Sequence, residues 1–89
     1  MNKGIITGIV VGTENENIIL CDVDSEGKKL YTVYLPQAAN ELKEKNSKKA
    51  VYLAEVIGSM ENDELGKVIF VPEVVNIKCI GKEEESIFN

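Results

Sequence analysis

Hydrophobic residues fall into five short runs rich in Val, Ile, Leu and Tyr, and polar segments separate these runs. Short β-branched and aromatic runs bounded by Gly, Asn and Asp are typical of strands joined by turns. The pattern predicts strands over residues 4–12, 18–24, 29–35, 50–58 and 67–80. The segments 13–17, 25–28 and 59–66 are the expected turns and loops.

Two residues inside these strands predict irregular geometry. Gly8 interrupts the first strand, where a glycine often marks a bulge or a bend. Pro72 interrupts the last strand and has no N–H to donate, so it implies a bulge or an edge position. Alternation along the third strand places Tyr31, Val33 and Leu35 on one face and Leu30, Thr32 and Tyr34 on the other.

The segment "QAANELKEK" (37–45) is the one predicted helix. It is rich in helix formers, and Ala38 and Leu42 have i, i+4 spacing. Pro36 stops the preceding strand and suits the first turn of a helix. The apolar stripe is narrow, so we expect this helix to cover one end of the fold rather than to form a layer.

Three strands, one short helix and two strands indicate an all-β fold with one short helix. A five-stranded barrel with the helix between the third and fourth strands is the arrangement of the oligonucleotide/oligosaccharide-binding (OB) fold. We expect residues 1–81 to form this barrel and residues 82–89 to form an acidic, flexible tail. A split α+β sheet and a differently wound small barrel give a similar pattern and remain alternatives.

Composition narrows the possible functions. The 89 residues carry a net charge of −5 with no His, and every cation is a Lys. Lack of His disfavours acid–base catalysis, and a negative field disfavours generic polyanion binding, so we expect a non-enzymatic protein without metal or cofactor. Cys21 and Cys79 are expected to be buried free thiols. With no long apolar run and no signal-like start, the chain is expected to be cytoplasmic.

The segments "TVYLPQAANELKEK", "KKAVYLAEVIG" and "GKVIFVPEVVNIKCI" resemble, in layout, bacterial single-stranded DNA-binding proteins and primosomal replication proteins. The resemblance covers roughly residues 3–80. It implies an OB fold and a role in replication, recombination or repair. Because one small barrel gives only a short footprint on a single strand, we also expect a homo-oligomer (dimer or tetramer). The acidic end "EEESIFN" is similar to the tail tip with which these proteins recruit partners. The chain departs from the family in lacking Trp and Arg, and Lys29 takes the expected Trp position.

Binding of single strands requires aromatic rings for base stacking and cations for phosphates. This requirement, with the resemblance, predicts Tyr31 as the stacking ring and Lys28 and Lys29 as phosphate contacts. Further candidate ligand contacts are Lys3, Lys67 and Phe70. The alternative is that Tyr31 is a half-buried strand residue and the two lysines are turn charges. The candidate partner-binding tail consists of Glu83, Glu84, Glu85, Ile87 and Phe88.

Two other functions remain open. The chain is compatible with a structural or adaptor barrel that acts through self-association or protein contacts, as the negative charge and missing Arg favour. It is also compatible with an acidic inhibitor that occupies the site of a nucleic-acid-binding protein.

Overall fold

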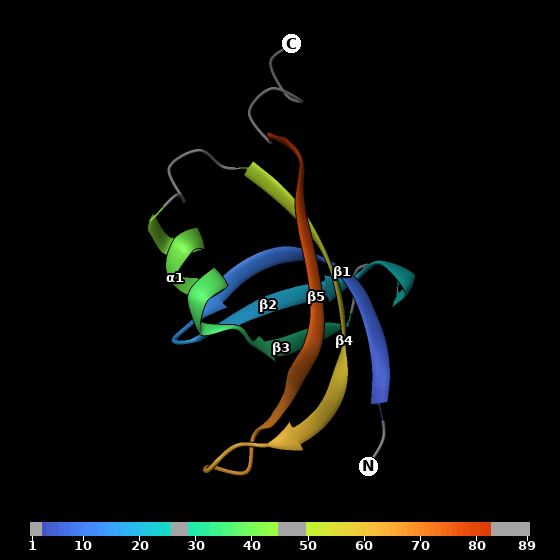
Figure 1. Cartoon of the computed structure of the whole chain (residues 1–89), viewed down its shortest axis with the longest axis vertical. Coiled ribbons are helices and arrows are strands. Elements are labelled where there is room, and N and C mark those ends of the chain that lie inside the picture. The colour runs from blue at the N-terminus through green and yellow to red at the C-terminus, as the bar shows by residue number, and fades with distance from the viewer. Residues whose placement is uncertain (1–2, 26–28, 45–49, 83–89) are drawn as a thin grey trace.

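The computed structural model describes residues 3–25, 29–44 and 50–82 (Figure 1). The elements are β1 (Lys3–Glu14), β2 (Asn17–Asp22), a 3₁₀ turn (Val23–Ser25), β3 (Leu30–Tyr34), α1 (Pro36–Glu44), β4 (Ala50–Asn62) and β5 (Val68–Lys82). The predicted mostly-β fold, with five strands and one short helix between the third and fourth strands, is confirmed.

The five strands form one sheet that closes on itself in the order β1-β2-β3-β5-β4, because β1 also pairs with β4. Four of the five pairings are antiparallel. The fifth joins β3 and β5 in parallel at the residue pair Val33 and Phe70. This short contact therefore completes the ring.

Strand β1 takes part in two pairings, and this bends the sheet. Its first part, Lys3–Ile9, pairs with β4, and its second part, from Gly8 to Glu14, pairs with β2. The register against β2 shifts between Val10 and Gly12, slightly beyond the glycine from which an irregularity was expected. Gly8 pairs on both sides, and a Cβ there would lie 2.6 Å from the carbonyl oxygen of Cys21.

The core lies inside the ring and draws on every long element. Its buried residues are Ile6, Ile18, Leu20, Val33, Ala39, Ala54, Val56 and Phe70. Helix α1 contributes Ala39 and packs Ala38 and Leu42 against this cluster. Because α1 lies against β1 and β2, it covers one end of the ring, as its narrow apolar stripe predicted.

The connection between β4 and β5 is shorter than the sequence predicted. Residues 59–66 were expected to form a polar loop, but Ser59–Asn62 continue β4 and pair residue by residue with Val68–Val71 of β5. Local polarity indicated a loop, and cross-strand hydrogen bonding to β5 overrides it. The true loop is therefore Asp63–Lys67.

Pro72 lies at a bulge, as predicted. The β4–β5 register shifts between Ile57 and Gly58, which pair with Val74 and Pro72, so Glu73 is the extra residue. Of the two cysteines, both free, Cys21 is half-buried and Cys79 is exposed. The expectation of two buried thiols is therefore wrong, because the end of β5 that carries Cys79 extends away from the core.

The described part of the chain contains no helix that is both long and apolar enough to span a membrane.

The bulge opposite Pro72 should make Gly58 essential for stability. A Cβ on Gly58 would lie 2.7 Å from the Pro72 Cα and closer still to the Val71 carbonyl oxygen, whereas a Cβ on Gly12 meets no atom within 4 Å. We expect Gly58→Ala to lower the free energy of unfolding by about 1–3 kcal/mol. Gly12→Ala should leave it unchanged or raise it by up to ~1 kcal/mol. Urea denaturation followed by circular dichroism measures both, and equal stability of the two variants would contradict the described bulge.

Candidate functional site

The outer face of β2 and β3 is the first candidate site. Cross-strand pairs join the residues of this face. They are Asn17 with Tyr34, Ile19 with Thr32, and Cys21 with Leu30. The intervening residues Ile18, Leu20 and Val33 are fully buried. Since side chains alternate along a strand, the six paired residues point away from the core. The outer face is therefore neutral and partly apolar.

Tyr34, and not Tyr31, is the aromatic ring on this outer face. Tyr34 is 41% exposed. Tyr31 pairs with the fully buried Leu20 and packs against the core. The prediction that Tyr31 is an open stacking platform therefore loses its geometric basis. The sequence did contain a signal for this orientation. Thr32 is polar and lies among large apolar residues, which indicates that its side of the strand faces solvent, and Tyr34 lies on the same side.

Lys29 lies beside Tyr31, as its position in the sequence suggested. Its Nζ is 5.4 Å from the Tyr31 ring centroid, which is within cation–π range. The Lys29 carbonyl oxygen accepts a hydrogen bond of 2.9 Å from the backbone N–H of Asp22, which ties the β2–β3 connection together. The Lys29 side chain therefore lies over the half-buried ring of Tyr31.

Lys67 lies at the same end of the outer face as Tyr34. Its Nζ forms an ion pair with Glu14. Glu14 pairs with Asn17 across β1 and β2, and Asn17 in turn pairs with Tyr34. The predicted cation and the exposed ring are thus brought to one edge of the sheet from positions far apart in the sequence.

Lys43 of α1 reaches this edge as well and was not predicted there. Its Nζ donates a hydrogen bond of 2.6 Å to the carbonyl oxygen of Asn15 in the β1–β2 turn. Asn15 has a positive φ of 55°, and the Leu35 N–H donates to the carbonyl of the next residue, Glu16. The turn is therefore anchored both by the segment that follows β3 and by the helix. No sequence spacing signals this contact, because it depends on how α1 packs.

Two other candidates do not join this edge. Lys3 begins β1 at its opposite end and pairs with Glu73, with 2.9 Å between Nζ and Oε1. Phe70 is only 2% exposed and is part of the core that closes the ring. Its proposed ligand contact is incompatible with this burial. Lys28 and the tail candidates Glu83, Glu84, Glu85, Ile87 and Phe88 lie outside the described residues.

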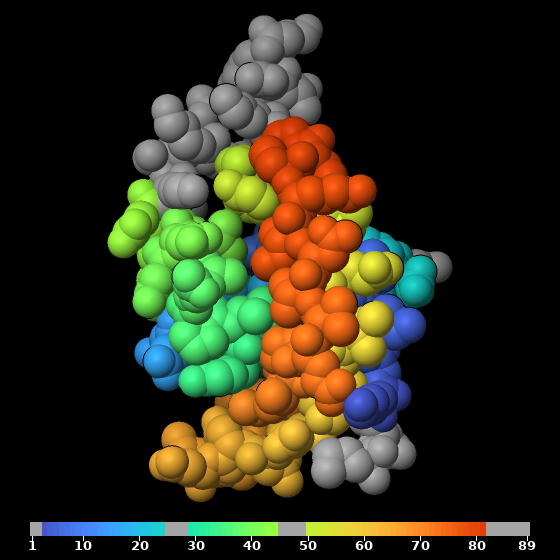
Figure 2. Space-filling view, viewed as in Figure 1, coloured from blue at the N-terminus to red at the C-terminus, as the bar shows by residue number. Residues whose placement is uncertain are grey.

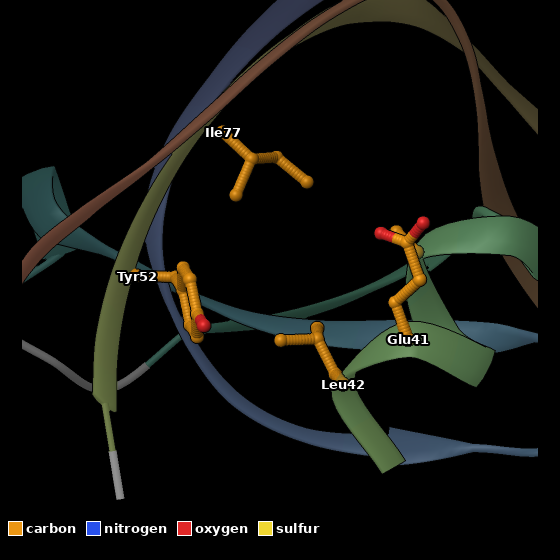
Figure 3. Close-up of a pocket in the computed structure, with 5 residues that line it drawn as sticks. Glu41, Leu42, Tyr52 and Ile77 are labelled. Carbon is orange, nitrogen blue, oxygen red and sulfur yellow. The ribbon is translucent and has the colours of Figure 1, made fainter. Parts of the chain in front are cut away.

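A second candidate site is a pocket between α1 and the β4–β5 pair. It has a volume of about 200 Å³ and is lined by Ala38, Glu41, Leu42, Tyr52 and Ile77. In Figure 3, Leu42 of α1 and Tyr52 of β4 point toward one another, with Glu41 beside Leu42 on the helix and Ile77 on the strand side of the pocket. The walls are mostly apolar. The i, i+4 spacing of Ala38 and Leu42 in the sequence indicated the helix side of this pocket. The same spacing gave no indication of which strands would face the helix.

Neither site has the arrangement of a metal centre. Among the described residues, no three His, Cys, Asp or Glu side chains gather closely enough to hold a metal ion. What the outer face offers is an accessible ring, neutral hydrogen-bonding groups and two lysines at its edge. What the pocket offers is an apolar cavity with one carboxylate.

The three tyrosines should differ in chemical accessibility. Tyr34 is exposed, whereas Tyr31 and Tyr52 are half-buried. We expect tetranitromethane to nitrate Tyr34 first under native conditions, with peptide mass spectrometry identifying the modified residue. Faster nitration of Tyr31 than of Tyr34 would mean that β3 presents the opposite face to solvent.

Comparison of the chain with protein-family models, curated proteins and solved structures found no match. A function for this chain can therefore be inferred only from its own sequence and structure.

Proposed function

We propose that this chain is an OB-fold protein that binds single-stranded nucleic acid, with single-stranded DNA as the first candidate, on the outer face of β2 and β3. The observation that carries the proposal is the exposed Tyr34 ring on a neutral face whose edge also holds Lys67 and Lys43. A role in replication, recombination or repair is part of this proposal.

The strand order supports the finer fold assignment. A five-stranded Greek-key barrel that binds ligands through its second and third strands and through the loops between strands one and two and strands four and five defines the OB arrangement. Here the ring has the order β1-β2-β3-β5-β4, and α1 follows β3. The β1–β2 turn and the β4–β5 loop border the outer face, and Lys67 belongs to the second of these.

The chemistry of the outer face suits the binding of single-stranded nucleic acid without preference for a base sequence. Base–aromatic stacking is worth about 1–3 kcal/mol per base, and every base has a face that can stack on Tyr34. Asn17 and Thr32 provide hydrogen-bonding groups beside the ring. Lys67 and Lys43 provide positive charge for the phosphates of the adjoining nucleotides.

The carboxylate of Glu14 competes with phosphate for Lys67. Both side chains of this ion pair are about half exposed, and an exposed ion pair contributes only about 0–1 kcal/mol. Phosphate can therefore replace Glu14 at small cost. The net charge of −5 remains unfavourable at long range, so we expect weak binding at physiological salt.

A second candidate function is a protein-binding adaptor barrel. The observation that favours it is an apolar row across β1, β4 and β5 on the outside of the ring, formed by Ile5, Ile57 and Val74. Ile5 is 66% exposed, and Val74 is exposed as well. Contiguous exposed apolar surface is typical of protein contact sites. An adaptor would not bind oligonucleotides.

Fluorescence titration with a labelled oligo-dT tests the primary proposal. For two phosphate contacts the slope of log K against log salt is about −1.4, so affinity should fall about sevenfold between 50 and 200 mM salt. Tyr34→Leu should weaken binding by about 5- to 150-fold, because it removes stacking, and Tyr34→Phe should retain affinity. Absence of binding at low salt would reject nucleic-acid binding and leave the adaptor function.

Removal of the competing carboxylate should strengthen binding. We expect Glu14→Gln to raise oligo-dT affinity about two- to fivefold, because Lys67 no longer has an ion-pair partner. Glu73→Gln is the matched control. This substitution also removes one acid and one exposed ion pair, between Glu73 and Lys3, but at a place that is distant from the outer face. Equal gains in both variants would show that only total charge matters and that Lys67 has no local role.

A further inference from the structure

The core side of β5 is only partly covered by the described residues. Across the β4–β5 ladder, Val75 pairs with Val56, and the next inward pair is Ile77 with Ala54. Both β4 partners are fully buried, and paired residues share a face of the sheet, so Val75 and Ile77 point toward the core side. Val75 is nevertheless 40% exposed, and Ile77 is half-buried. Apolar surface of β5 therefore remains open on this side.

The pocket between α1 and the β4–β5 pair belongs to this open surface, because Ile77 lines it. Its other apolar walls are Tyr52 of β4 and Ala38 and Leu42 of α1, and each of these side chains is half-buried. The volume of the pocket is about 200 Å³, and an apolar cavity of about 150 Å³ already accommodates benzene. A phenyl ring therefore fits between the Tyr52 ring and the Leu42 side chain, which point toward one another in Figure 3.

The last described residue, Lys82, lies close to this pocket. Lys82 pairs with Ala50, and Tyr52 lies only two residues further along β4, a distance of about 7 Å. Figure 2 shows the end of β5 (red-orange) beside the first residues of β4 (yellow-green) and above α1. Residues 83–88 follow directly with the sequence EEESIF, in which the last two residues are apolar.

We propose that residues 83–88 fold back along their own chain and that the Phe88 ring occupies the pocket. A reversal of chain direction takes about four residues, and Lys82 with the three glutamates that follow supplies them. Three extended residues then span about 10 Å, which brings Phe88 to the level of Tyr52 and Ile77. In this position the segment covers the open side of β5. The contact leaves the outer face of β2 and β3 uncovered and does not depend on nucleic-acid binding.

The small size of the contact favours a tethered ring over a ring from another molecule. Burial of one phenyl side chain corresponds to a dissociation constant of about 10–100 mM. At micromolar concentrations a second molecule therefore leaves the pocket nearly empty. A short tether gives an effective concentration on the order of 10 mM, so we expect Phe88 to be docked in roughly 10–50% of molecules.

Charge opposes this contact. Glu41 lines the pocket, and residues 83–85 are glutamates. Like charges that approach each other destabilise a contact, so Glu41→Gln should increase the docked fraction. The contact therefore rests on apolar burial and on the short tether.

A disulfide trap tests the contact, because Cys79 lies beside the pocket. Cys79 pairs with the pocket residue Tyr52 and is exposed. When Phe88 is docked, the residue before it lies next to Cys79, so Ile87→Cys in a Cys21→Ser background should form an intramolecular disulfide. Equilibration with oxidised and reduced glutathione measures the effective concentration of the two thiols. Addition of Phe88→Ser should lower this effective concentration about 3- to 10-fold, because the anchoring ring is lost.

Val23→Ser is the matched control for the loss of Phe88. It removes an exposed apolar side chain elsewhere and should leave the effective concentration unchanged. An equal effective concentration with and without Phe88 would overturn the proposal. A disulfide that forms mainly between two molecules would overturn it as well, since the pocket would then hold the segment of a second copy.

Nuclear Overhauser effects in the wild-type chain need no variant. Effects between the Phe88 ring and the methyl groups of Leu42 or Ile77, with intensities that do not change on dilution, support the contact. Absence of any such effect contradicts it.

Discussion

The single parallel pairing between β3 and β5 is the constraint on which the rest of the structure depends. Val33 and Phe70 meet there, and their exposed fractions are 0% and 2%. Burial of these two side chains closes the ring and fixes which side of β3 faces inward. Because side chains alternate along the strand, Tyr34 then faces solvent and Tyr31 packs inward. The candidate binding face is therefore a consequence of how the ring closes.

The strands and the helix could be predicted from the sequence because their signals are local: β-branched runs, Pro36 at the helix start and Pro72 at a bulge. Which tyrosine of β3 faces solvent could not be predicted in the same way. Both faces of β3 carry a tyrosine and an aliphatic residue, so Thr32 is the one local signal for the outer face, and the core contributed by the other strands decides between the two faces. The extension of β4 through Ser59–Asn62 was missed for a related reason, because pairing with β5, and not local composition, orders that segment.

The charges of the chain weaken the expected binding of nucleic acid but do not exclude it. The two lysines at the edge of the outer face each have a local partner, Glu14 for Lys67 and the Asn15 carbonyl for Lys43. These contacts hold the side chains near the ring, and exposed contacts of this kind are easily exchanged.

The closure of the ring can be tested directly by nuclear Overhauser effects between methyl and aromatic protons in solution. The structure predicts effects between the Val33 methyl groups and the Phe70 ring, residues that are distant in sequence and adjacent only when β3 and β5 pair. Their presence, together with effects that join Tyr31 to the buried cluster, would support the account. Absence of any effect between β3 and β5 while β2 and β3 remain paired would mean that the sheet is open, and the assignment of Tyr34 to a binding face would then fail.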